Sequence, residues 1–344
     1  MPKFYGMENE LQNTLIHLNY DVELIESKSL LFDYHGTKSK FRFLRKIYFN
    51  LFSPDKRFIK NSLNRIENLR FDILFSINGH SICPYLFNKF KKYNPKLRSI
   101  LFLWDSSSMY SWKSELKYFD KVFTFDPVDS VKFKIEYKPN FYIKAPKYIE
   151  EEKKHDLFFA GKFNPYRSSL FDPIFESAVR SGVNFYLRLW AGYRILFHNK
   201  FIYRLLICLR ITGSWVNDYI TNFEAVEGIL KRNLISSNAV SFQEVQQHMI
   251  CSNVILDIPF PGQSGYSHRL IEALANGKKA ITSNVSIKSE KFYNPDQIHL
   301  IDPLDPKIDF EWVQDRVLFP VNDYIKDLEL SMWLKTILNV EISR

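Results

Sequence analysis

The most informative stretch of the sequence is SNVILDIPFPGQSGYSHRLIEALANGKKAITSN, residues 252–284. It opens with an apolar run of strand length, NVILDI, and passes through a loop of prolines and glycines into the helix-compatible SHRLIEALANG. The apolar run KAITS follows as a second strand. A strand, a helix and a strand in this order form a βαβ unit, whose two strands are parallel. The stretch therefore predicts an α/β fold.

The same alternation recurs earlier in the chain. FDILFSI (71–77), RSILFLW (98–104) and KVFTF (121–125) have the length and composition of buried strands, with helix-compatible PYLFNKFKKY between the first two. LFFAG (157–161) and VNFYLRLW flank another helical segment. Two such series in a chain of 344 residues predict two Rossmann-like domains that face each other across a cleft.

The charged segment YIEEEKKHD, residues 148–156, is the expected linker. We therefore expect an N-terminal Rossmann-like domain over residues 1–150 and a C-terminal, nucleotide-binding one over residues 151–320. Residues 321–344 are expected to form a C-terminal helix that packs back on the N-terminal domain. DVELIES, residues 21–27, is predicted to be a further strand of that domain.

Charge and cysteine content limit the class of protein. Lys and Arg number 47 against 38 Asp and Glu, a net charge of +9, which suits an anionic partner such as a nucleotide. Because a bias toward Lys, Asn, Ile, Phe and Tyr gives the same excess, and because there is no nucleic-acid motif, we expect no nucleic acid partner. The three cysteines lack metal-binding spacing, and there is neither a signal peptide nor an apolar run of about 18 residues. A cytoplasmic protein is expected.

The loop and helix from Gln263 to Glu272 predict an anion site. Small residues that lead into a helix N-terminus offer backbone N–H groups to a phosphate, and Ser264 and Ser267 are candidate caps. His268 and Arg269 add side chains in the first turn, and Glu272 follows on the same helical face, where it would reach ribose hydroxyls. The same residues also fit a capped helix with a solvent-exposed Arg–Glu pair.

The sequence around this loop resembles the donor-binding signature of bacterial GT-B glycosyltransferases of the CgeB-like group, which are found among capsule and lipopolysaccharide biosynthesis enzymes. KFYGMENELQNTLIHLNYDVELIES, FDILFSINGH, LFLWDSSSMY, YFDKVFTFDPVDSVKF, HDLFFAGKFNPYR and KFYNPDQIHLID are similar to other blocks of the family. Two departures stand out. The family's opening strand has no counterpart before Pro2, so a shortened or misassigned start is expected, and Pro303 replaces a basic residue.

The resemblance implies transfer of a sugar from a nucleotide-sugar to a growing surface glycan, such as lipopolysaccharide, capsule or exopolysaccharide. The absence of the family's opening strand leaves an alternative of a different class, a non-catalytic nucleotide-sugar-binding or scaffold subunit of a glycan assembly complex. Since no D-x-D pair occurs, we expect no metal and no other cofactor. The expected donor-binding residues are Gly161, Arg167, Gln263, Ser264, Gly265, Tyr266, Ser267, His268, Arg269 and Glu272.

The catalytic base is expected from the N-terminal domain, which would bind the acceptor. Asp105 and His80 each follow a predicted strand, and either side chain could take a proton from an acceptor hydroxyl. Asp105 fits equally well as a helix cap, and a lone histidine is more often structural. Glu8 or Glu10 are further alternatives.

Two segments invite a peripheral contact with an anionic membrane. Residues 193–215 and 38–57 mix basic with apolar side chains, as a surface near a lipid-linked acceptor would. Partly buried helices with solvated basic ends are the favoured alternative for both.

Overall fold

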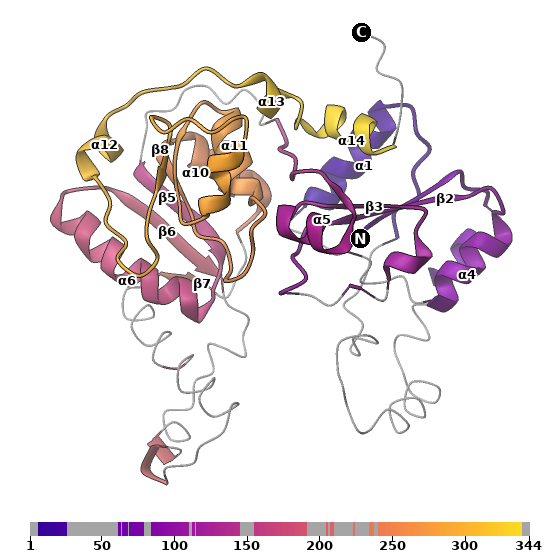
Figure 1. Cartoon of the computed structure of the whole chain (residues 1–344), viewed down its shortest axis with the longest axis horizontal. Helices are drawn as coiled ribbons and strands as arrows, with labels where there is room; N and C mark the ends of the chain where they lie inside the picture. Colours follow the sequence, from indigo (N-terminus) through magenta and orange to yellow (C-terminus); the bar gives the residue numbers. More distant parts are fainter. Residues whose placement is uncertain are drawn as a thin grey trace. The chain divides into compact units, whose positions relative to one another are not determined.

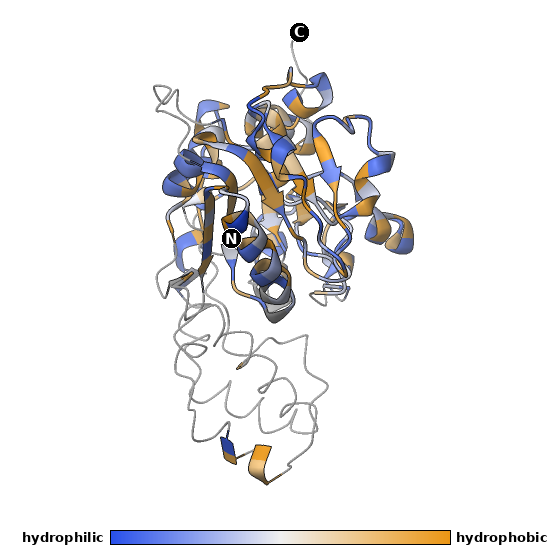
Figure 2. Ribbon diagram, turned by 90° about the vertical axis from the view of Figure 1, so that its left-hand side faces the viewer, coloured by the Kyte–Doolittle hydropathy of each residue, from blue (hydrophilic) through white to orange (hydrophobic). Residues whose placement is uncertain are grey.

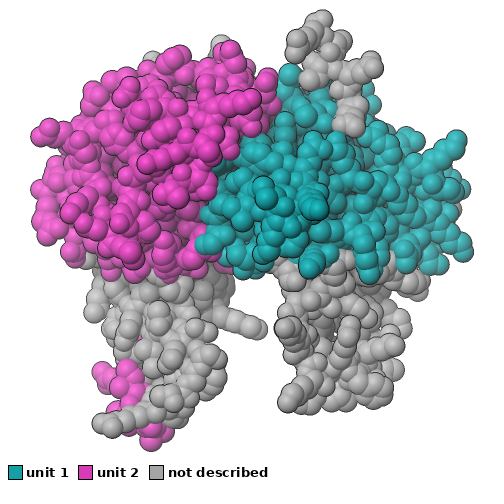
Figure 3. All heavy atoms as spheres, viewed as in Figure 1, with its two compact units in different colours: residues 1–140, 262–266, 330–344 teal, residues 141–261, 267–329 magenta. Residues whose placement is uncertain are grey.

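The computed structural model divides into two compact units (Figure 1; Figure 3). Unit 1 comprises residues 1–140, 262–266 and 330–344, and unit 2 comprises residues 141–261 and 267–329. The structure describes residues 6–25, 61–62, 64–67, 69–78, 84–109, 112–113, 115–144, 155–190, 204–205, 207–209, 223, 234–236 and 240–338. The cleft expected between the domains stays a prediction.

Unit 1 is built on a four-stranded sheet in the order β1-β2-β3-β4. All three strand pairs are parallel, and Ile77, the last residue of β1, is aligned with Phe102 of β2. The strands are β1 (Ile73–Ile77), β2 (Arg98–Leu103), β3 (Lys121–Thr124) and β4 (Glu136–Tyr137), and the helices are α1 (Met7–His17), α4 (Pro84–Tyr93) and α5 (Pro127–Phe133). The three strands expected from FDILFSI, RSILFLW and KVFTF are confirmed.

Unit 2 contains a six-stranded parallel sheet in the order β10-β9-β8-β5-β6-β7. Its strands are β5 (His155–Lys162), β6 (Phe185–Trp190), β7 (Ile235–Ser236), β8 (Ser252–Asp257), β9 (Lys279–Thr282) and β10 (Ile298–Leu300). Its longer helices are α6 (Pro165–Arg180), α10 (Phe242–Ile250) and α11 (His268–Ala275), and the shorter ones are α12 (Phe310–Gln314) and α13 (Asp323–Lys326). The predicted α/β fold with parallel sheets is confirmed.

Burial of β8 on both faces explains its sequence. All six of its residues are buried, as expected for a central parallel strand with helices on either side. One face of β8 packs against α6 and α12 in the larger hydrophobic core. The helices α10 and α11 also contact β8 (Figure 1). In Figure 2 the strands are drawn largely in orange, the colour of hydrophobic residues.

The helix α11 has clear boundary signals. Ser267 caps its N-terminus by accepting a hydrogen bond from the backbone N–H of Leu270, and Leu270, Ile271 and Leu274 are buried. Gly277 ends the helical segment with a positive φ of 65°. A Cβ atom at Gly277 would lie 2.4 Å from the carbonyl oxygen of Phe319, so this position also has no room for a side chain.

The unit boundaries differ from those expected at residues 150 and 320. Phe141 packs against His268, and the backbone N–H of Tyr142 donates to Leu328, so residues 141–144 and 321–329 belong with unit 2. The predicted strand at residues 21–27 is not found in its described part, because Asp21–Ile25 pair with no strand among the described residues. The segment at 38–57 lies outside the described residues, as does most of 193–215. Within the described chain, every helix is too short or too polar to span a lipid bilayer.

The C-terminal helix α14 (Leu330–Leu338) belongs to unit 1. The fully buried indole of Trp333 lies edge-on to Phe102 at a ring distance of 4.7 Å and to Phe75 at 6.3 Å. Its Nε1–H donates to the carbonyl oxygen of Pro139 at 2.9 Å. This single side chain therefore fastens the end of the chain to the sheet of unit 1.

We expect Trp333→Ala to lower the free energy of unfolding by about 3–5 kcal/mol, because a buried aromatic ring is replaced by a cavity. The measurement is denaturant unfolding followed by circular dichroism. Thr336→Ala, on the exposed side of the same helix, is the matched control and should change stability by less than about 1 kcal/mol. Equal effects of the two substitutions would contradict this packing.

Candidate anion and nucleotide site in unit 2

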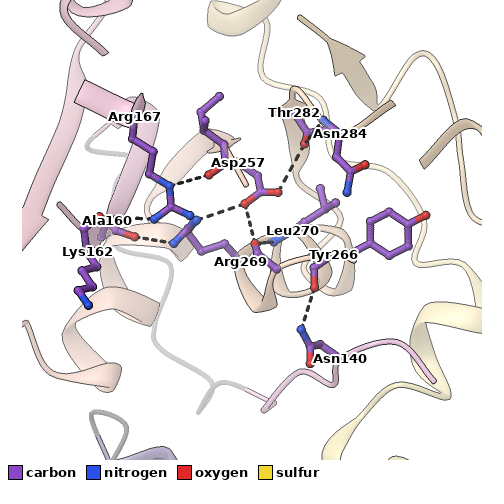
Figure 4. A network of polar contacts seen from close by, with 12 residues as sticks. Asn140, Ala160, Lys162, Arg167, Asp257, Tyr266, Arg269, Leu270, Thr282 and Asn284 are labelled. Carbon is purple, nitrogen blue, oxygen red and sulfur yellow. Dashed lines mark hydrogen bonds and ion pairs between the residues drawn. The ribbon is translucent and has the colours of Figure 1, made fainter. Parts of the chain in front are cut away.

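Three charged side chains meet at the carboxyl ends of β5 and β8 (Figure 4). Asp257, the last residue of β8, is 1% exposed and accepts hydrogen bonds from Ser267 Oγ at 2.6 Å and Arg269 Nη2 at 3.2 Å. Thr282 Oγ1 lies 3.5 Å from its other oxygen. One buried carboxylate thus links the end of a central strand to the first turn of α11.

Arg167 enters the same place from α6. Asn164 caps that helix, and the buried Arg167 guanidinium donates from Nε to the carbonyl oxygen of Ile258 at 2.8 Å. It also stacks on Phe260, with 3.9 Å between the guanidinium carbon and the ring centre. Contacts of this kind fix the orientation of the cation without neutralising its charge.

Arg269 donates hydrogen bonds to a residue of β5 and to a residue of β8. Its Nη1 donates to the carbonyl oxygen of Ala160 at 2.9 Å, and its Nη2 donates to Asp257. Gly161 lies beside it, and a Cβ atom there would lie 3.1 Å from Arg269 Nη1. The Nε of Arg269 is buried and has no hydrogen-bond partner within the described part of the chain. One donor of the guanidinium is therefore not used by the described residues.

The charges of this cluster do not balance. Burial and the neighbouring positive charge of Arg269 lower the pKa of Arg167 to about 9, against the opposing effect of Asp257. At neutral pH, among the described residues of this cluster, two guanidinium groups share one carboxylate, which leaves one positive charge in excess. An excess charge in a desolvated place is costly, and an anion bound there would relieve that cost.

Glu272 is buried on α11 rather than exposed. Glu272 is 3% exposed. Burial raises its pKa to about 8, against the opposing effect of Arg269. Its Oε1 has no hydrogen-bond partner among the described residues. The alternative of a solvent-exposed Arg–Glu pair is therefore wrong, because the helix turns Glu272 inward. A buried oxygen without a partner among the described residues is rare in folded proteins and calls for an explanation.

His268 is a neutral group and not a cation. Its Nδ1 lies 2.9 Å from the carbonyl oxygen of Phe141 and donates to it, since a carbonyl oxygen only accepts. Burial lowers the pKa of His268 to about 4, and the charge of Arg269 acts in the same direction. The possibility that His268 adds positive charge to an anion site is therefore excluded at neutral pH, and the ring holds the residues after 140 against α11.

The loop between β8 and α11 belongs to unit 1 over residues 262–266. Ser264 donates to the carboxylate of Asp126 from both its hydroxyl and its backbone N–H, and the N–H of Gly265 donates to the same group at 3.3 Å. The sequence predicts that these amides face a phosphate, whereas here they surround a carboxylate. Both anions satisfy the same donors, which is why the sequence signal did not distinguish them.

Further contacts hold Gly265 and Tyr266 in this loop. A Cβ atom at Gly265 would lie 2.5 Å from the ring of Phe125, and the side-chain amide of Asn140 donates to the carbonyl oxygen of Tyr266 at 2.8 Å (Figure 4). Gln263 is half-buried in the same segment. Among the expected donor-binding residues, the structure groups Gly161, Arg167, Ser267, His268, Arg269 and Glu272 in unit 2, and places Gln263, Ser264, Gly265 and Tyr266 in unit 1.

Asp105 follows β2 in unit 1, and its carboxylate accepts a hydrogen bond from the side-chain amide of Asn78. Asn78 is fully buried with a positive φ of 55°, and its Oδ1 accepts from the backbone N–H of Trp104 at 2.9 Å. The sequence analysis missed Asn78, although an Asn-Gly pair directly after a strand signals this backbone conformation. His80 lies outside the described residues, and Glu8 is buried on α1.

Within the described ranges, no group of three or more His, Cys, Asp or Glu side chains is arranged to hold a metal ion. Metal independence stays a prediction.

We expect Glu272→Gln to change how stability depends on pH. The pKa of Glu272 in the folded protein is about 8, above the ordinary value of 4.5, so folding favours the protonated form. The free energy of unfolding of the wild type should therefore fall as pH rises from about 5 to about 8, by up to about 1.4 kcal/mol per unit, and the glutamine variant should lack this loss. Denaturant unfolding across this range measures the difference, with the exposed Glu311→Gln as control. A constant difference between Glu272→Gln and the wild type would refute the buried acid.

We expect Asp126→Asn to destabilise unit 1 by about 2 kcal/mol or more, because Asp126 caps α5 and also accepts from Ser106 and Ser264. Burial opposes ionisation of Asp126, but these hydrogen bonds hold its pKa below the ordinary value, so its contribution should be lost as pH falls. Thermal unfolding at pH 7 and at about pH 2.5 tests both statements, because the loss begins only as the pH falls below the ordinary value of 3.8. The exposed Asp72→Asn is the control, and a variant no less stable than this control would contradict the assignment.

No family model matches the chain, and no curated protein matches it in sequence. Among solved structures it is similar to the apo form of a lipopolysaccharide outer core galactosyltransferase, WaaB, with 14% identity, a TM-score of 0.43 and coverage of 91% of this chain and 83% of that one. It is also similar to a sucrose-phosphate synthase from Thermosynechococcus elongatus (12% identity, TM-score 0.43, coverage 95% and 85%) and to the catalytic domain of Starch Synthase IV from Arabidopsis thaliana (9%, 0.43, 84% and 73%). At these identities and TM-scores the comparisons carry no functional argument, which rests instead on the residues of the site.

Proposed function

We propose that the protein is a glycosyltransferase that binds a nucleotide-sugar in unit 2. The observation that carries this proposal is the uncompensated positive charge of Arg167, Arg269 and Asp257 at the carboxyl ends of β5 and β8. Ligands of open parallel sheets bind at this edge, and a helix N-terminus adds its own partial positive charge. A diphosphate linked to a nucleoside and to a sugar has the charge and length for such a place.

The ribose is assigned to Glu272. Its buried Oε1 without a partner would accept a hydrogen bond from a ribose hydroxyl, one turn along α11 from Arg269. With a pKa of about 8, the Glu272 carboxyl group is protonated at neutral pH. A ribose hydroxyl that donates to its Oε1 would favour the ionised form. Nucleotide binding is thereby expected to be stronger above pH 8 than at pH 6.

Transfer of the sugar leaves a nucleoside diphosphate, whose added negative charge must be stabilised. The two arginines supply that stabilisation in an arrangement fixed before the substrate binds, since each is held by backbone carbonyl groups. A base is needed for the acceptor hydroxyl, and Asp105, oriented by Asn78, is proposed for this role. The acceptor is proposed to be a growing surface glycan, with the enzyme in the cytoplasm, without a metal and with peripheral membrane contact.

The second candidate is a non-catalytic nucleotide-sugar-binding or scaffold subunit of a glycan assembly complex. The contacts of Ser264 and Gly265 with Asp126 favour it, because they occupy loop amides that a phosphate would otherwise use. The two functions share the donor site and differ in turnover.

We expect Glu272→Gln to weaken binding of a nucleoside diphosphate by about tenfold, since the amide oxygen is a weaker acceptor than a carboxylate and the amide cannot ionise. Arg269→Lys should weaken it at least as much, because lysine cannot reproduce the guanidinium contacts. Titration calorimetry with UDP, GDP, ADP and CDP is the measurement, and Arg180→Lys, at the exposed end of α6, is the control. If neither variant differs from the control for any of the four nucleotides, the donor site is wrongly assigned.

We expect Asp105→Asn to abolish most turnover while nucleotide affinity stays within about twofold of the wild type. Product analysis with a panel of nucleotide-sugars, together with the same calorimetry, separates the two effects. A wild-type protein that binds donors but neither transfers nor hydrolyses them would support the scaffold function instead.

A further inference from the structure

The carboxylate of Asp257 is enclosed by protein groups. The residue is 1% exposed, and it accepts hydrogen bonds from Ser267 Oγ at 2.6 Å and from Arg269 Nη2 at 3.2 Å (Figure 4). The side chain of Arg269, by contrast, is 15% exposed. A ligand of this site would therefore touch Arg269 and not Asp257. Any effect of Asp257 on binding acts through its charge or through the orientation that it gives to Arg269.

Charge and orientation can be separated at this position. Ser267 and Arg269 both donate to Oδ1 of Asp257, so an asparagine would keep an acceptor oxygen for both donors. The other oxygen lies 3.5 Å from Thr282 Oγ1, a hydroxyl oxygen that can accept from an amide. Asparagine thus matches the contacts of Asp257 and removes only its negative charge.

The charge of Asp257 acts through space within the cluster. Burial and the charge of Arg269 lower the pKa of the buried Arg167 to about 9, and the charge of Asp257 acts in the opposite direction. The carboxylate therefore favours a positive charge at this place and would repel an anion bound there. Between unit charges at the short distances of such a cluster, this repulsion changes affinity by about tenfold or more.

The donor and the product of sugar transfer differ in charge. Transfer breaks the bond between the anomeric carbon and an oxygen of the terminal phosphate, and that oxygen keeps the electron pair. The acceptor oxygen forms the new bond to the sugar and loses its proton. The second ionisation of a terminal phosphate has a pKa of about 6, so at pH 7 the nucleoside diphosphate carries about one negative charge more than the nucleotide-sugar.

We infer that Asp257 is a specificity-determining residue, which weakens binding of the nucleoside diphosphate product relative to the nucleotide-sugar donor and so promotes product release. The two arginines attract the product more strongly than the donor, and the repulsion from Asp257 offsets part of that difference because it grows with ligand charge. This inference rests on the proposed function, since it concerns the ligands of the same site.

The test compares two ligands that differ only in the last ionisation. One is the nucleoside diphosphate that binds best among UDP, GDP, ADP and CDP, and the other is its methyl ester on the terminal phosphate. We expect Asp257→Asn to raise the preference for the free diphosphate over the ester by about fivefold or more at pH 7. At pH 5, where the free diphosphate is mostly protonated once more, the rise should shrink to less than about twofold. Titration calorimetry gives both affinities.

Two further variants separate this effect from a structural one. Glu311→Gln removes a negative charge at an exposed position of α12 and should leave the preference unchanged. If Asp257→Asn alone does not fold, the same substitution is compared with its parent in an Arg269→Gln background, where the count of buried positive charges does not exceed that of the wild type. The preference for the free diphosphate should rise there as well.

The outcomes distinguish this inference from the proposed function. If the wild type binds nucleoside diphosphates and Asp257→Asn changes both affinities by the same factor at pH 7, Asp257 only orients Arg269 and the inference is wrong while the donor site stands. A rise in preference that is as large at pH 5 as at pH 7 would also overturn it, because the effect would not follow ligand charge. If the wild type binds none of the four nucleotides, the proposed function fails together with the inference.

Discussion

The carboxylate of Asp257 organises the candidate site. It is a charge placed at the end of a fully buried strand, and it is tolerated there because Ser267 and Arg269 donate to it from the next helix. The same contacts fix where α11 begins and which way Arg269 points. Arg167 then occupies the remaining space as a second cation, and the local charge becomes positive. The positive charge proposed to bind an anion is thus a consequence of how one buried carboxylate receives its hydrogen bonds.

Unit 1 also has a hydrogen-bonded carboxylate directly after two of its strands. Asp105 follows β2 and Asp126 follows β3, and each accepts hydrogen bonds from groups that a parallel sheet leaves at its carboxyl edge. Within the described part of the chain, six groups donate to Asp126, and four of them are backbone N–H groups. A carboxylate with so many donors stays ionised although it is buried, as the lowered pKa of Asp126 indicates. In Glu272 the opposite balance holds, because burial acts with few opposing contacts.

The two units differ in how many neighbours their apolar strands have among the described residues. In unit 2 the central strands β5 and β8 have neighbours on both edges, and helices cover their side chains. In unit 1 the apolar strand β1 has one neighbour among the described residues and borders a cavity. The helices α1 and α14 also line that cavity, and Trp333 packs α14 against β2.

The sequence by itself determined most of the helices and strands, with the predicted strand at residues 21–27 as the exception. Alternation of apolar strand-length runs with helical segments was sufficient to predict parallel strands in both units, because burial on both faces imposes a continuous apolar run that is visible in one dimension. It also placed Ser267 at a helix start and Arg167, Arg269 and Glu272 near one another, since helix caps and the ends of neighbouring strands have fixed positions in such sheets.

Only the tertiary structure decided what those side chains do. The charge state of Glu272 and His268 depends on burial, which the order of residues does not show. The contacts of the Ser264 and Gly265 amides with Asp126, and of His268 with Phe141, join residues more than 100 positions apart. Desolvation and long-range hydrogen bonds leave no periodic trace in the sequence, and so protonation states and loop contacts had to come from the fold.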